Sequence, residues 1–302
     1  MQDGADAPVK LGVQQTLHYL SPPAIVMAIS LVLTSLVITS NPFLYQFTLP
    51  TLAMLIENLL VTAMIAVIGG AATLATFVIF RRGGELLSRL VVAVFLSPVF
   101  FLLIVFVGET VLLLLFFQGH NQLSLSIITF ASIFFASISV VLILSDALGA
   151  SGRNLIFTLY GLILGVFLGT SFTWYSSLAV MGVLAAEDTL FATKLGPTVV
   201  DADPHRQVRS AFVFVVGPLV IGIGDLVVAG ALVAYSLRFF GWIIAILTAV
   251  AVLVGCFINV RIVARRPNRV IPGLPIPLLC ALVPILLSLL RITLLALALP
   301  VP

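Results

Sequence analysis

Residues 222–235 read GIGDLVVAGALVAY, so Asp225 follows Gly222-Ile223-Gly224 and precedes an apolar run. The hydrophobic segment around this acid is long enough to cross a bilayer, which takes about 20 residues. A carboxylate inside hydrocarbon is costly and by default indicates a functional site. A second acid, Asp188, lies in the preceding hydrophobic segment. The two acids together predict a site inside a membrane protein.

The composition agrees with a membrane location. Of the 302 residues, 62% are hydrophobic and only 8% are charged, which is far from the composition of a soluble domain. Hydrophobic runs of about 20 residues recur along nearly the whole chain. We therefore expect an all-α, polytopic protein whose residues 1–302 form a single integral membrane domain.

Charge and cysteine usage exclude several classes of function. The net charge of +3 does not indicate nucleic-acid binding, because the basic residues fall in short loops between the hydrophobic runs. Cys256 and Cys280 lie in apolar segments, and the three histidines show no metal-ligand spacing. No metal and no cofactor are expected, and the short loops favour a chain that acts without accessory subunits.

Nine hydrophobic spans are predicted. They cover roughly 22–40, 50–80, 90–117, 123–147, 154–171, 174–193, 212–235, 239–261 and 274–299. We expect spans one to five, within 1–171, to form a scaffold, and spans six to nine, within 172–302, to carry the chemistry.

The lysines and arginines predict the orientation. Twelve of them lie on the side of the N-terminus and of the loops after the even-numbered spans, whereas Arg238 lies on the other side and Arg291 within the last span. The excess of basic residues marks the cytoplasmic side. We therefore expect a cytoplasmic N-terminus and a C-terminus outside.

Asp188 and Asp225 are predicted to lie at one depth. Asp188 is six residues before Lys194, at the cytoplasmic end of its span, and is therefore roughly 9 Å inside it. Ala211–Val216 is β-branched and aromatic and is followed by Gly217-Pro218. A membrane helix that begins at Pro218 places Asp225 roughly 10 Å from its start. The alternative is that each acid is an isolated helix-end residue facing a water-filled crevice.

Two neighbouring carboxyls favour acid–base chemistry. They cannot both ionise cheaply, so one keeps its proton. The ionised carboxyl can then take a proton from water while the protonated one polarises a carbonyl, as aspartyl hydrolysis requires. Gly222 and Gly224 remove side chains beside Asp225, so that neighbouring or substrate backbone can approach closely.

A third irregular element precedes the last span. The sequence Pro272-Gly273-Leu274-Pro275-Ile276-Pro277 holds three prolines in six residues, which prevents regular helix and leaves backbone groups without internal partners. Within a membrane such backbone is tolerated only where protein or water supplies the partners. The segment starts on the cytoplasmic side, at the predicted depth of both aspartates. The alternative is a simple loop that leads into a helix.

With these elements the chain resembles the presenilin and signal peptide peptidase family of intramembrane aspartyl proteases, and it is most similar to compact archaeal presenilin homologues. That family has nine spans, Tyr-Asp in span six, GxGD in span seven and Pro-Ala-Leu at span nine. The resemblance implies that Asp188 and Asp225 are catalytic, that Gly222 and Gly224 support the site, and that Pro272, Gly273, Leu274 and Pro275 shape the cleft. The implied substrates are transmembrane helices of other proteins.

The chain departs from the family pattern at two positions. Glu187 stands where the family has tyrosine, so either Glu187 points away on the helix or the assignment within span six is off by one. Gly273 stands where the family has alanine, which frees the backbone further. Unwound substrate is implied as well, and Ala211–Val216 is a candidate for pairing with it; otherwise this run is the first turns of span seven.

A proton-coupled secondary transporter, which would use the acids as a relay, is the alternative function. Glu57, Glu109 and Asp146 are also predicted within spans. Pairing of Arg291 with Glu57 or Glu109 would lower the cost of burying them, whereas Asp146 is expected to cap or snorkel. A prepilin-peptidase-like enzyme is disfavoured, since the lysine usual two residues after the GxGD aspartate in that family is absent. Gly161, Gly165 and Gly169 predict close helix packing.

Overall fold

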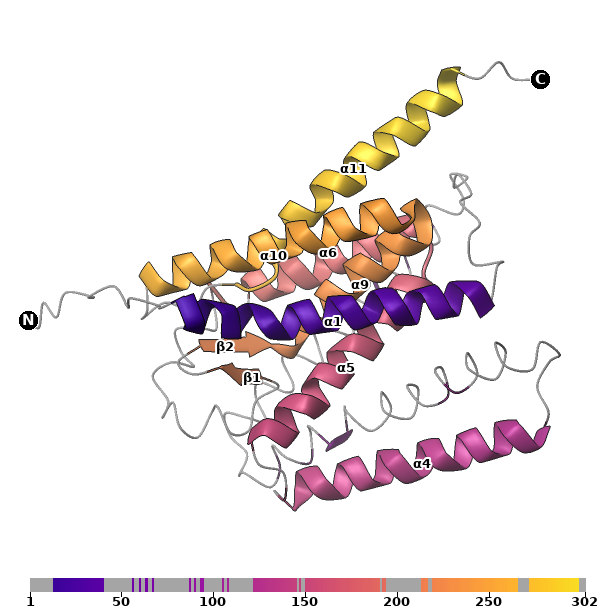
Figure 1. The fold of residues 1–302 in the computed structure, drawn as a ribbon, viewed down its shortest axis with the longest axis vertical. Coiled ribbons are helices and arrows are strands. Elements are labelled where there is room, and N and C mark those ends of the chain that lie inside the picture. Colours follow the sequence, from indigo (N-terminus) through magenta and orange to yellow (C-terminus); the bar gives the residue numbers. More distant parts are fainter. Residues whose placement is uncertain are drawn as a thin grey trace, which may run out of the picture.

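The computed structural model describes residues 13–40, 122–145, 147, 150–190, 192–193, 213–216, 219–265 and 272–298, and isolated positions between 56 and 108. Within these residues most of the chain is helical (Figure 1). The helices are α1 (Val13–Ser40), α4 (Gln122–Leu144), α5 (Ala150–Ser171), α6 (Trp174–Leu190), α9 (Ile223–Phe240), α10 (Trp242–Arg265) and α11 (Pro275–Ala298). The predicted spans 50–80 and 90–117 lie outside the described residues, apart from isolated positions.

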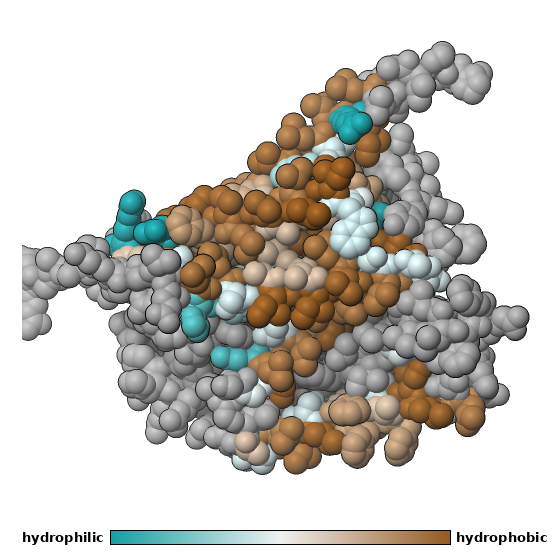
Figure 2. Space-filling view, in the orientation of Figure 1, coloured by the Kyte–Doolittle hydropathy of each residue, from teal (hydrophilic) through white to brown (hydrophobic). Residues whose placement is uncertain are grey.

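The described helices are those of a membrane protein. Five of them contain a stretch that is long and apolar enough to cross a bilayer: Thr16–Ser40, Asn154–Ser171, Ile223–Phe240, Trp242–Arg265 and Pro275–Leu294. Their outward faces carry large apolar side chains, such as Ile243, which is 76% exposed, and these form broad hydrophobic surfaces (Figure 2). Apolar surface of this extent is stable against lipid rather than water.

Helix α9, which follows the GxGD sequence, lies at the centre of the bundle. It packs against α1, α5 and α10, with smaller contacts to α6 and α11 (Figure 1). Every residue from Leu226 to Leu237 is buried. A helix that is apolar on all sides belongs in the interior, and the surrounding helices enclose α9 from Leu226 to Leu237.

The glycine stripe of α5 sets how closely α5 and α9 approach. A Cβ atom added at Gly161 would lie 2.6 Å from the Leu226 Cβ, and one at Gly165 would lie 2.7 Å from the Val227 carbonyl oxygen. At Gly169 the carbonyl oxygen of Ala231 would also be 2.7 Å away. The prediction that this stripe permits close helix packing is confirmed, and the partner is the helix that carries Asp225.

The span predicted over 212–235 is not one continuous helix, and the helix start suggested at Pro218 is wrong. Strand β1 (Val213–Val216) pairs antiparallel with β2 (Leu219–Gly222), and α9 begins only at Ile223. The register places Val216 opposite Leu219 and Val213 opposite Gly222. β-Branched and aromatic residues favour strands, and a two-residue connection containing glycine suits a hairpin. This pair of strands is also a departure from a purely α-helical chain.

Candidate active site

Asp188 lies near the C-terminal end of α6 and contacts the irregular segment before α11. Its Oδ2 accepts a hydrogen bond from the backbone N–H of Leu274 at 2.9 Å. The neighbouring acid, Glu187, lies about 100° further round the helix. Of the two acids, Asp188 is therefore the one that the fold joins to the Pro272–Leu274 segment, in agreement with its assignment from sequence.

Asp225 is the third residue of α9, in the first turn of that helix. Its Oδ2 accepts a hydrogen bond at 3.2 Å from the backbone N–H of Gly222, the N-cap residue. An acid at this position stabilises a helix start by satisfying a free N–H and by favourable interaction with the helix dipole. Asp225 thus has a structural contribution whatever its chemistry. It lies closer to its helix end than the roughly 10 Å predicted, because α9 starts later than Pro218.

Gly273 brings Asp225 to the same segment that Asp188 contacts. A Cβ atom added at Gly273 would lie 2.4 Å and 2.6 Å from the two carboxylate oxygens of Asp225. The carboxylate therefore occupies the space of a side chain at position 273, while Asp188 binds the N–H of the next residue. The three elements that sequence reasoning placed at one depth do meet.

The Pro272–Pro275 segment is irregular up to its last residue. Helix α11 begins at Pro275, and proline suits the first position of a helix because it has no N–H to leave unpaired. Leu274 is buried, whereas Pro272 and Gly273 are half-buried. Since this backbone is outside the helix, the Leu274 N–H is free to bind a carboxylate. The irregularity predicted for Pro272–Pro277 is confirmed at 272–274 and is wrong at 275–277, which form the first turn of α11.

Two residues of α10 hold this segment in place, and sequence reasoning missed both. Gly255 lies against α11, where an added Cβ would be 2.4 Å from the Pro277 Cα. One turn later, the Asn259 side-chain Nδ2 donates a hydrogen bond of 2.6 Å to the Gly273 carbonyl oxygen. Residues four apart lie on one helix face, so Gly255 and Asn259 form one contact surface of α10 for this segment. An asparagine within an apolar span was the signal available in the sequence.

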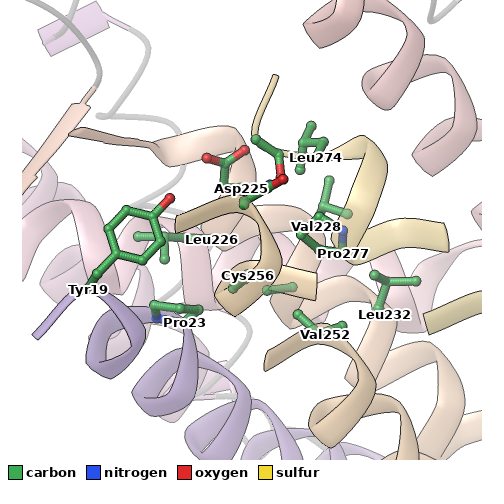
Figure 3. A pocket seen from close by; sticks show the side chains of 13 residues that line it. Tyr19, Pro23, Asp225, Leu226, Val228, Leu232, Val252, Cys256, Leu274 and Pro277 are labelled. Carbon is green, nitrogen blue, oxygen red and sulfur yellow. The ribbon is translucent and has the colours of Figure 1, made fainter. Parts of the chain in front are cut away.

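A cavity of about 20 Å³ lies beside Asp225 (Figure 3). Tyr19 of α1 and Asn259 of α10 line it together with Asp225 and Cys256. In Figure 3 the Tyr19 ring extends from α1 with its hydroxyl on the side of the Asp225 carboxylate. Sequence reasoning gave Tyr19 no role, since nothing in the local sequence relates α1 to a residue more than 200 positions later.

The glycines of the GxGD sequence are not in close contact with described residues. A Cβ atom at Gly224 would have no neighbour within 4 Å among them, and Gly224 is exposed. At Gly222 the nearest atom would be Asp225 Oδ2, at an ordinary contact distance of 3.5 Å. The close approach of neighbouring backbone that was expected here is instead found at Gly255, which lies against Pro277, whereas Gly273 makes room for the Asp225 carboxylate. Among the described residues, none covers the surface beside Gly224.

The other ionisable residues predicted within spans add nothing to this site among the described residues. Glu57, Glu109 and Asp146 lie outside them, and Arg291 is exposed on α11. Across the described part of the chain, no three His, Cys, Asp or Glu side chains are grouped so as to hold a metal ion.

Comparison with known proteins adds no assignment: no protein-family model and no curated protein matches this chain.

Proposed function

We propose that this protein is an intramembrane aspartyl protease of the presenilin type, with nine spans, a cytoplasmic N-terminus and a C-terminus outside. One observation carries the proposal. Asp188 from α6 and Asp225 from α9 contact adjacent residues, Leu274 and Gly273, of one irregular segment. Two separate helices thus bring carboxyl groups to one segment of a third element, and capping of either helix does not require this.

The carboxyl pair supports hydrolysis of a peptide bond. One carboxylate takes a proton from a water molecule, whose oxygen bonds to the scissile carbonyl carbon, while the other, protonated carboxyl donates a hydrogen bond to the carbonyl oxygen. A proton then passes to the amide nitrogen as the C–N bond breaks. The products are a carboxylic acid and an amine, and the pair is ready for another cycle. Because one group acts as base and the other as acid, the cleavage rate should fall on both sides of an optimum pH.

The substrate would be a transmembrane helix of another protein. Carbonyl groups in a helix are hydrogen-bonded internally, so the segment must unwind before water can attack it. Strand β2 ends at Gly222, directly before the helix that carries Asp225. An unwound substrate could extend the β1–β2 pair by adding a strand at its edge. This would bring substrate backbone towards the surface at Gly224.

A peptide that carries a hydroxyl group in place of the scissile carbonyl tests the dyad without turnover. Such a compound resembles the tetrahedral intermediate, and transition-state analogues bind at least about 100-fold more tightly than substrates. We expect tight binding to the wild type in liposomes and loss of this binding in Asp188→Asn and Asp225→Asn. Equal binding by all three proteins would contradict the proposal. Proton flux in the same liposomes, abolished by the same variants, would instead favour the transporter.

A further inference from the structure

The cavity beside Asp225 has the size and the polar lining of a site for one water molecule. Its volume is about 20 Å³, and a cavity of roughly 10–15 Å³ is sufficient for a water when two to four polar groups surround it. Tyr19, Asp225 and Asn259 line it, and their side chains carry a hydroxyl, a carboxylate and an amide, while Cys256 adds a sulfur, a weaker acceptor. They come from α1, α9 and α10, three separate helices.

Asn259 gives an independent indication that this cavity binds a polar ligand. The residue is only 3% exposed. Its Nδ2 is used by the Gly273 carbonyl, but its Oδ1 is buried and has no hydrogen-bond partner among the described residues. Exchanging the two amide atoms would set oxygen against oxygen at Gly273, so the orientation is fixed. A buried acceptor without a partner is costly, and a water in the adjoining cavity would satisfy it.

We propose that this cavity binds the water that is consumed in the reaction, and that Tyr19 and Asn259 are positioning residues for it. The inference rests on the proposed protease function. The water donates one hydrogen bond to Asn259 Oδ1 and the other to the Asp225 carboxylate, while the Tyr19 hydroxyl donates to the water oxygen. Asp225 is then the carboxylate that takes the proton, and Asp188 is the acid that polarises the carbonyl. The apolar remainder of the lining, such as Leu226 and Val252, excludes further water.

The first test replaces the hydroxyl alone. Tyr19→Phe keeps the ring and removes the donor, so we expect kcat to fall about tenfold, the value of one hydrogen bond to a charged system, with KM unchanged. Tyr235→Phe is the matched control, because Tyr235 is fully buried and its hydroxyl also lacks a partner among the described residues, but it does not line the cavity. Wild-type kcat in Tyr19→Phe, or equal losses in both variants, would overturn the assignment.

The second test fills the cavity. Val252→Ile adds one carbon next to the cavity, whereas Val260→Ile adds it at an equally buried position of the same helix away from the lining. We expect only Val252→Ile to lower kcat. If the two variants have the same kcat, the cavity has no part in the reaction.

A readout without turnover separates this inference from the proposed function. A structure of the wild type at a resolution that shows ordered water should place one water within hydrogen-bonding distance of Asn259 Oδ1 and Asp225, and Val252→Ile should lose it. A cavity without ordered water overturns the inference, even if the protein cleaves substrate. Ordered water in a protein that never cleaves supports the binding site and contradicts the protease function.

Discussion

The close contact between Gly255 of α10 and Pro277 of α11 predicts how far the Gly255→Ala substitution would displace the start of α11. The added methyl group would lie 2.4 Å from the Pro277 Cα and 2.8 Å from the Pro277 nitrogen, whereas ordinary contacts begin at 3.4 Å. Both neighbours are backbone atoms, which cannot rotate away. The start of α11 must therefore move outward by about 1 Å, and Gly273 and Leu274, which precede it, must move with it.

A shift of this size is small for the fold and large for the chemistry. Overpacking by one methyl group typically costs about 1–3 kcal/mol of stability, which leaves a folded chain. Misplacement of reacting groups by about 1 Å lowers a rate by about 100-fold, or roughly 2.7 kcal/mol of activation free energy. We therefore expect Gly255→Ala to lose about 100-fold in kcat, although residue 255 itself contacts neither aspartate in this account.

Gly182→Ala on α6 is the matched control. It is also a glycine-to-alanine change within a helix, but its added Cβ has no neighbour within 4 Å among the described residues. Both variants are reconstituted in liposomes with a single-span substrate, and initial cleavage rates are measured at saturating substrate, together with thermal unfolding. Cleavage at the wild-type rate by folded Gly255→Ala, or an equal loss of activity in Gly182→Ala, would contradict a displacement of Gly273 and Leu274 as the cause.

Two further glycines give predictions of opposite kind. The methyl group of Gly224→Ala has no neighbour within 4 Å in the described part of the chain, so we expect unchanged thermal unfolding. We also expect weaker cleavage, because substrate backbone would approach this surface, and wild-type cleavage kinetics would contradict that approach. Gly165→Ala brings its methyl group to 2.7 Å from the Val227 carbonyl oxygen, so we expect it to lower the free energy of unfolding by about 1–3 kcal/mol. Denaturation in detergent measures this loss, and an unfolding midpoint equal to that of Gly182→Ala would contradict the packing of α5 on α9.

The sequence predicted that Asp188 and the Pro272–Pro275 segment lie close together, because the distance of a residue from the end of a hydrophobic span gives its depth in the bilayer. Asp188 lies near the end of one apolar run, and Pro272–Pro275 begins another. The rule that consecutive spans alternate in direction then places these elements on one side of the bilayer. The glycine stripe of α5 was predictable for a similar reason, since four-residue spacing leaves small residues on one helix face whatever the partner.

Other features depended on contacts that local sequence does not encode. The run Val213–Val216 is as apolar as a membrane helix, so hydropathy placed it within a span. Its β-branched residues and the following Gly217-Pro218 favoured the alternative of an extended segment, and the structure has a strand there. Gly255 and Asn259 matter because of what lies opposite them on α11. Tyr19 matters through α1 packing on α9 and α10. Such long-range pairings follow from how the helices pack.

Cleavage by variants of the two aspartates shows whether Asp188 and Asp225 form a catalytic pair. A single-span substrate is incubated in liposomes with the wild type, Asp188→Asn, Asp225→Asn and Glu187→Gln, each checked for folding, and products are identified by mass. We expect the wild type and Glu187→Gln to cleave the substrate within its span, and neither aspartate variant to cleave it. Cleavage by folded Asp225→Asn at the wild-type rate, or no cleavage of several substrates by the wild type, would contradict this expectation.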